Sequence, residues 1–186
     1  TRQEVQDLHD IGMKNAPDGD SAPRARLLGN RAGWPFAFPE LADDEEERQL
    51  SERLGYEAAD MAERLGLFDL ASAALDNAQG AVAARGLYGR ALRIASRRGE
   101  ILSKVEDPLE IGDFFAMNSW ANTEIGHYAE AVRKASEGIE RTKGRGGNAE
   151  IHAVAWRTVA HFRLGEWDEA LADFARPIGL RDARRD

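Results

Sequence analysis

The chain has 186 residues, of which 42% are hydrophobic and 31% charged, with a formal net charge of −8 and no cysteine. The lack of cysteine excludes disulfides, thiolate catalysis and cysteine-ligated metals, and with the lack of a recognisable secretory signal it predicts a cytoplasmic protein. The acidic balance, without a stripe of Lys and Arg, argues against direct nucleic-acid binding, and no apolar run approaches the roughly 18 residues of a membrane span.

Residues 1–42 are predicted to form two short helices and a connection rich in proline and aromatic residues. Helices are expected at about 1–14 and 23–33, separated by the turn-rich NAPDGDSAP. The following WPFAFPE places aromatic residues at alternate positions between prolines, which predicts an extended segment covering the edge of a helical core. We interpret this segment as a packed connection rather than a ligand site.

A longer helix is predicted at about 43–65. Asp43 followed by Glu46 indicates an N-cap with a reciprocal acidic partner, so the acidic run is interpreted as a cap and not as a metal site. Apolar residues recur there at three- and four-residue steps, at Leu50, Leu54, Ala58, Met61, Ala62 and Leu65. Further helices are expected at about 68–84, 88–104, 109–125, 128–142, 149–164 and 167–176. No stretch alternates like a strand, so the chain is predicted to be all-α.

A short motif recurs four times and consists of Gly, any residue, an aromatic, two residues and Ala. Its copies are Gly66/Phe68/Ala71, Gly86/Tyr88/Ala91, Gly126/Tyr128/Ala131 and Gly165/Trp167/Ala170. At a helix end, Gly adopts the left-handed conformation without a Cβ penalty. The aromatic is expected to lie in the groove between the two helices, and Ala lets them approach closely. The near-40 spacing of the last three copies predicts stacked helical hairpins.

This pattern resembles the tetratricopeptide repeat, a helix-turn-helix unit with a turn glycine, an aromatic and a small alanine at these spacings. The resemblance covers hairpins at about 70–104, 109–142 and 148–180, preceded by the helix 43–65. It implies a right-handed α-α superhelix, a solenoid of about 3.5 hairpins over residues 43–186, as in large bacterial regulatory proteins. The chain departs from the family in its longer period and in four positions where a small residue is expected, Gln79, Arg98, Ser119 and Thr158.

The resemblance implies that the first helix of each hairpin lines a groove for a peptide or partner helix. Carried over by position, the groove candidates are Asn77, Asp113, Met117, Trp120, His152, Trp156 and Val159. The last three follow four-then-three spacing and so share one helix face, as do Met117 and Trp120. Met and Trp at such spacing are also typical of a core, so groove and core both stay open for Trp120 and Trp156. Apolar residues replace the Asn and Lys of the family's carboxylate-binding grooves, which favours an apolar segment as ligand.

Two functions are carried forward from the sequence. The leading hypothesis is a non-enzymatic protein- or peptide-binding scaffold, regulatory in bacterial signalling or transcription control. The alternative is an architectural domain that forms homo-oligomers through its exposed ends, because the final helix has an apolar stripe and no capping helix after it. Pro177 is expected to end that helix. The candidate residues for this end face are Trp167, Leu171, Phe174 and Ile178.

Catalytic, metal and cofactor chemistry finds no support in the sequence. The four histidines, His9, His127, His152 and His161, are scattered and form no His-Glu-x-x-His pattern. The glycine-rich segment 143–150 lacks the Lys-Ser/Thr ending of a phosphate-binding loop, so we interpret it as a loop between repeats. We therefore predict no catalytic residue, no metal and no cofactor, and an atypical helical enzyme stays a third hypothesis without support.

Overall fold

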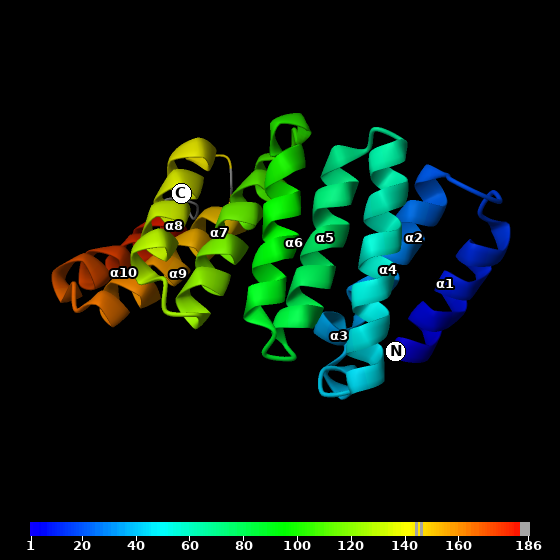
Figure 1. Ribbon diagram of the computed structural model, residues 1–186, viewed down its shortest axis with the longest axis horizontal. Coiled ribbons are helices and arrows are strands. Elements are labelled where there is room, and N and C mark those ends of the chain that lie inside the picture. Colours follow the sequence, from blue (N-terminus) through cyan, green and yellow to red (C-terminus); the bar gives the residue numbers. More distant parts are fainter. Residues whose placement is uncertain (144, 146, 183–186) are drawn as a thin grey trace. The chain divides into compact units, whose positions relative to one another are not determined.

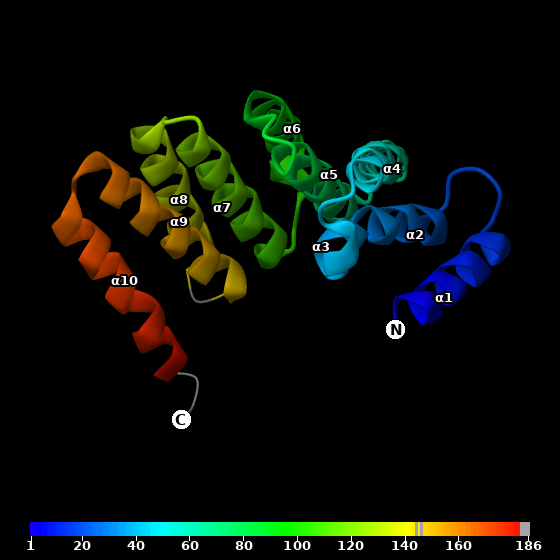
Figure 2. The same ribbon diagram turned by 90° about the horizontal axis from the view of Figure 1, so that it is seen from below.

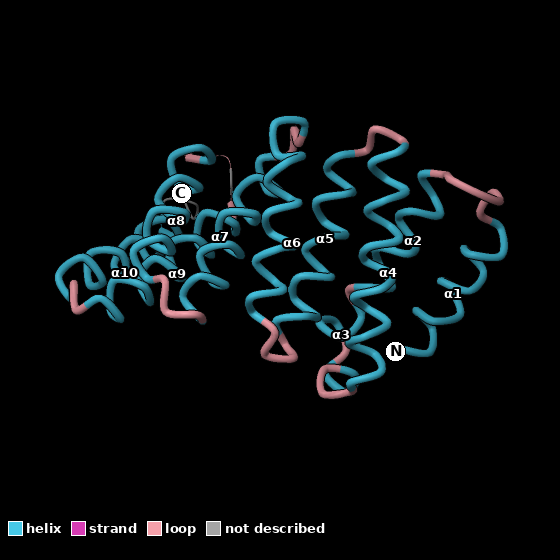
Figure 3. The backbone as a smooth tube through the Cα atoms, viewed as in Figure 1, coloured by secondary structure: helices cyan, strands magenta, loops and turns pink. Residues whose placement is uncertain are grey.

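The computed structural model describes residues 1–143, 145 and 147–182, with side chains described up to residue 175. The chain divides into two compact units, Thr1–Val105 (unit 1) and Glu106–Asp186 (unit 2). The predicted division near residue 42 falls inside unit 1. Helices and turns make up the whole described part, in which no strand occurs (Figures 1 and 3). The prediction of an all-α chain is confirmed.

Unit 1 is a layer of helices built around alanine. Its elements are α1 (Arg2–Asn15), α2 (Ala22–Ala32), α3 (Trp34–Ala37), the 3-10 turn η1 (Pro39–Leu41), α4 (Glu45–Arg64), α5 (Phe68–Ala83), α6 (Tyr88–Ile101) and η2 (Leu102–Lys104). Helix α4 packs along α2 and α5, and α5 also packs against α2 and α6. Ala58, Ala62, Ala74 and Ala78 are fully or almost fully buried, and their small side chains let the helices approach closely.

The segment after Gly33 corrects one prediction, because it forms α3 and η1 instead of an extended connection. Pro35 and Pro39 each occupy the first turn of one of these short helices, where the fixed φ of proline suits a helix and its missing N–H is not needed. Trp34 is buried, with Phe38 edge-on at 5.6 Å between ring centroids and the Arg31 guanidinium 4.3 Å from its ring centre. The aromatic residues therefore close the core as helical turns.

The start of α4 corrects a second prediction. Asp44, not Asp43, is the N-cap, and its side chain accepts hydrogen bonds from the backbone N–H of Glu46 at 2.9 Å and of Glu47 at 3.2 Å. Asp43 instead pairs with Arg48 at 3.0 Å. Two adjacent aspartates can both cap a helix in principle, so the sequence pattern is ambiguous by one residue.

Unit 2 consists of two helical pairs. Helices α7 (Pro108–Glu124) and α8 (Tyr128–Thr142) form the first, and α9 (Asn148–Leu164) and α10 (Trp167–Asp182) the second. Helix α9 packs against both α7 and α8, and α10 packs against α9 on the side away from α7 (Figure 2). A buried cluster joins the first three of these helices and contains Ala116, Ala135, Ile139, Ala153 and Val154.

The end of α10 corrects a third prediction, because the helix continues through Pro177 to Asp182. Proline inside a helix removes one backbone hydrogen bond and favours a kink, but the turns on either side can still form. The candidate Ile178 lies outside the residues whose side chains are described.

The repeated motif occupies equivalent positions in four helix-to-helix turns. Its glycines all have positive φ, of 72°, 73°, 83° and 81° at Gly66, Gly86, Gly126 and Gly165. The alanine of each copy is buried, and the aromatic is the first residue of the next helix. The aromatic side chains are only half-buried in the first three copies, and Trp167 is mostly exposed.

Arg98 occupies a position of α6 at which the repeat pattern has a small residue. Although a small residue is expected there, Arg98 is fully buried on α6. Its guanidinium donates hydrogen bonds to Asp76 at 2.7 Å and to Ser72 at 3.2 Å, both on α5. A buried charge needs such partners, so this ion pair replaces the usual small-residue contact between the two helices.

Candidate protein-binding site

Four of the predicted groove residues meet in unit 2, where α7 and α9 lie side by side. The indole rings of Trp120 on α7 and Trp156 on α9 have centroids 5.9 Å apart and are tilted by 34°. Trp156 Nε1 donates a hydrogen bond of 2.7 Å to His152 Nε2. His152 Nδ1 lies 3.9 Å from Asp113 Oδ1, across on α7. We call these four residues the α7/α9 cluster.

The local sequence explains why these side chains share one face. His152 and Trp156 are four residues apart on α9, and Asp113 and Trp120 lie two turns apart on α7, so each pair projects from one side of its helix. The start of α7 is set by Asp107, whose side chain accepts from the backbone N–H of Leu109 at 2.8 Å. Gly165, in the left-handed conformation, ends α9.

The hydrogen bond to Trp156 determines the tautomer of His152. An Nε2 atom that accepts a hydrogen bond carries no proton, so the neutral ring carries its proton on Nδ1. That atom is the one nearer Asp113. The imidazole thus lies between the carboxylate on α7 and the indole of Trp156 on α9, and its hydrogen bond orients the two rings on α9.

The α7/α9 cluster is partly open to solvent. The side chains of Asp113 and His152 are 25% and 40% exposed. Both tryptophans are of intermediate exposure, and Trp156 also packs against the buried cluster of unit 2. Each tryptophan therefore has some surface that a ligand could reach, and Trp156 also contributes to the core.

The remaining groove candidates lie in different places. Met117 is half-buried on α7, one turn from Asp113 and from Trp120. Val159 shares the helix face of His152 and Trp156 but lines a different groove, between α9 and α10. Asn77 belongs to unit 1, where its Nδ2 donates to the carbonyl oxygen of Gly29 on α2 at 3.1 Å. Asn77 therefore has a packing role between two helices of that unit.

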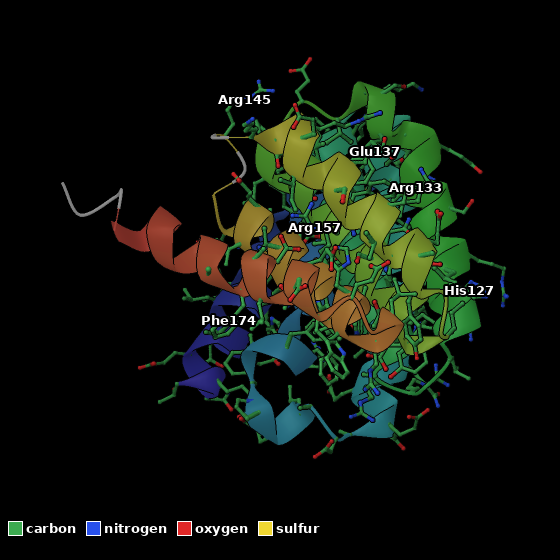
Figure 4. All side chains as sticks on the ribbon, turned by 90° about the vertical axis from the view of Figure 1, so that its left-hand side faces the viewer. His127, Arg133, Glu137, Arg145, Arg157 and Phe174 are labelled. Atoms are coloured by element: carbon green, nitrogen blue, oxygen red, sulfur yellow. The ribbon has the colours of Figure 1, made fainter. Side chains whose placement is uncertain are left out.

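A second surface, the α9/α10 groove, has a volume of about 590 Å³ and is mostly apolar. Its residues are Thr158, Val159, Phe162, Arg163, Trp167, Ala170, Leu171 and Phe174. The four large apolar side chains are between 63% and 67% exposed: Phe162, Trp167, Leu171 and Phe174. Figure 4 views this end with α10 nearest and Phe174 on its lower edge. The end-face residues Trp167, Leu171 and Phe174 thus lie together, whereas Phe162 was missed, although its four-residue step from Thr158 on α9 signals a shared face.

Unit 1 has a polar pocket of about 480 Å³, whose charged side chains pair with one another. Glu52 on α4 lies almost buried between Arg85, at 3.0 Å, and Arg90. Burial raises the pKa of the nearby Tyr56 hydroxyl above its usual value. The opposite charges compensate one another and join α4 to the turn before α6, so we assign the pocket no ligand.

Metal-binding groups and membrane-spanning helices are both absent from the described residues. No group of three or more His, Asp or Glu side chains there has an arrangement suited to a metal ion. No helix in the same part of the chain combines the length and the apolar character needed to cross a bilayer.

Comparison with known proteins finds no family model that matches the chain, and no similar curated protein or solved structure. The tetratricopeptide resemblance therefore rests on the sequence motif alone.

Proposed function

We propose that the chain is a non-enzymatic scaffold that binds an apolar segment of a partner protein at the α7/α9 cluster. The observation that carries the proposal is the pair of partly exposed indoles, Trp120 and Trp156, with Trp156 hydrogen-bonded to His152 beside Asp113. Large aromatic side chains with an accessible face contribute strongly to protein recognition because they bring much contact area at little cost in side-chain entropy.

The packing order of the helices supports a tetratricopeptide-like superhelix of about 3.5 hairpins as the fold behind this function. In unit 2, α9 packs on both α7 and α8, and in unit 1, α5 packs on both α2 and α4. This is the order expected when the first helix of each hairpin covers the hairpin before it. In that arrangement α7 and α9 are the first helices of consecutive hairpins, the helices that line the ligand groove in the family. The biological setting we propose is a regulatory assembly in the bacterial cytoplasm.

The chemistry of the cluster defines the expected ligand. An apolar or aromatic side chain of the partner packs on the exposed indole faces, and the His152 edge and the Asp113 carboxylate offer polar contacts at one end. We expect each of the two tryptophans to contribute on the order of 2 kcal/mol or more to the binding free energy. This corresponds to a factor of about 30 in affinity.

The test is selection of binding peptides from a random library displayed on phage, followed by titration with three variants. We expect Trp120→Ala and Trp156→Ala each to weaken binding of the selected peptides about 30-fold. The matched control is Leu109→Ala, an exposed apolar residue on the same helix α7, which should leave binding unchanged. Circular dichroism checks that all variants stay folded. Peptides that bind equally well to wild type and both Trp variants would contradict the proposal, as would a library that yields no binder.

A further inference from the structure

The exposed side of α10 has the residue spacing of a helix that pairs with another helix. Trp167, Leu171 and Phe174 follow a four-then-three spacing, and the sequence continues it with a four-residue step to Ile178. Such a repeat keeps one apolar seam on a single side of a helix, as in coiled coils. The seam borders the α9/α10 groove, and the small Ala170 lines the groove between the two helices.

The internal repeat of the chain shows what kind of element fits this groove. Superposing the motif glycines Gly126 and Gly165 makes Ala135 of α8 equivalent to Phe174 of α10. Ala135 is fully buried and belongs to one cluster with Ala153 and Val154 of α9. The same hairpin face is thus covered by a helix in the first pair of unit 2, whereas Phe174 is 67% exposed in the second. An α-helix is the complementary element.

A second copy of the chain supplies such a helix, and the exposed apolar side of its own α10 is covered by the same contact. Each of the four exposed side chains of the groove can bury roughly 100–150 Å², so one copy contributes on the order of 500 Å². A symmetric pair then buries about 1,000 Å², the lower limit for a specific interface. Two-fold pairing is also the commonest form of self-association, because one patch covers itself.

We propose that the α9/α10 groove is a homodimer interface in which α10 of a second copy packs along α10 and α9 about a two-fold axis. The interface buries Phe162, Trp167, Leu171 and Phe174 of both copies. The proposal does not depend on the α7/α9 cluster, which lies between α7 and α9, and a dimer leaves both copies of that cluster in place.

The experiment is sedimentation equilibrium of the whole chain from low to several hundred micromolar. Wild type is expected to approach twice the mass of one chain, whereas Phe174→Asp and Leu171→Asp should dimerise with affinity reduced more than about tenfold and stay mainly monomeric. The matched control is Leu8→Asp on α1, an equally exposed leucine at 69%, which should dimerise like wild type. A wild type that stays monomeric overturns the proposal. So does a dimer that persists in Phe174→Asp, or one that only Leu8→Asp abolishes.

A crosslinking measurement tests the location of the interface without changing the apolar seam. The chain contains no cysteine, so Ala175→Cys, exposed beside Phe174, introduces a single thiol. A short bismaleimide should link two copies of this variant. The control is Ala84→Cys, exposed in unit 1, which should stay unlinked under the same conditions. Equal linkage of both variants, or of Ala84→Cys alone, overturns the assigned interface.

Discussion

Arg157 on α9 and Asp173 on α10 form a two-point ion pair. The Arg157 Nε and Nη2 atoms donate to the two carboxylate oxygens at 2.6 and 2.5 Å. The same guanidinium donates to Ser136 Oγ on α8 at 3.0 Å, so one side chain connects three helices of unit 2. This pair therefore holds α10 against α9, next to Phe174 of the α9/α10 groove.

Asp173→Asn is expected to lower the free energy of unfolding of unit 2 by about 3 kcal/mol, because Arg157 keeps its charge in a mostly buried position. The side chains of this pair are only 16% and 9% exposed. Urea unfolding followed by tryptophan emission measures the change, since three of the four tryptophans, Trp120, Trp156 and Trp167, lie in unit 2. Asp168→Asn, which changes an exposed carboxylate on the same helix, is the control. A similar midpoint for both variants would show that the ion pair adds nothing to stability.

Gly55→Ala is expected to destabilise unit 1 by about 1–3 kcal/mol, because there is no room for a methyl group. A Cβ at position 55 of α4 would lie 2.8 Å from the carbonyl oxygen of Ala74 on α5. Gly89→Ala in α6 meets nothing within 4 Å, so it should be neutral or stabilise the helix by up to about 1 kcal/mol. Thermal unfolding followed by circular dichroism compares the two, and equal melting temperatures would refute the close approach of α4 and α5.

The pKa of Asp20 is expected to lie below that of an ordinary aspartate, because the Arg64 guanidinium hydrogen-bonds to both carboxylate oxygens, at 2.5 and 3.0 Å. A lowered folded-state pKa means that the pair stabilises the fold above the unfolded value of about 3.9 and is lost as the pH falls through the folded value. An NMR titration of the Asp20 carboxyl carbon measures the midpoint. Arg64→Gln should raise it toward the ordinary value, and an unchanged midpoint in that variant would contradict the assignment.

His152→Ala is expected to change the indole N–H of Trp156, because the variant removes its hydrogen-bond acceptor. The indole N–H resonance should shift and exchange with solvent faster, as for a donor released to water. The Trp34 signal, from the other unit, serves as the internal reference. Phe162→Ala, an exposed residue on the same helix, controls for a general effect on α9. A Trp156 signal that is identical in wild type and His152→Ala would remove the basis for an ordered cluster.

Much of the helix order follows from local signals. Gly66, Gly86, Gly126 and Gly165 mark helix ends because left-handed backbone is costly for other residues, and these four positions adopt it. Sequence reasoning was wrong where two local readings compete. Pro35 and Pro39 are compatible with an extended segment and also with two successive helix starts. The structure has the helix starts, with Trp34 packed into the core. Adjacent aspartates at 43 and 44 left the cap ambiguous in the same way.

The sequence by itself determined the all-α class, the turn positions and which side chains share a helix face, because these depend on residues within about one turn of each other. Only the tertiary structure decided which faces are covered. It brought Trp120 close to Trp156 and Asp113 close to His152 across two helices. It also placed Asn77 in a hydrogen bond to α2, and it left Phe162 of α9 and Phe174 of α10 exposed. The physical reason is that solvent exposure depends on neighbours distant in the chain, which the spacing along one helix does not record.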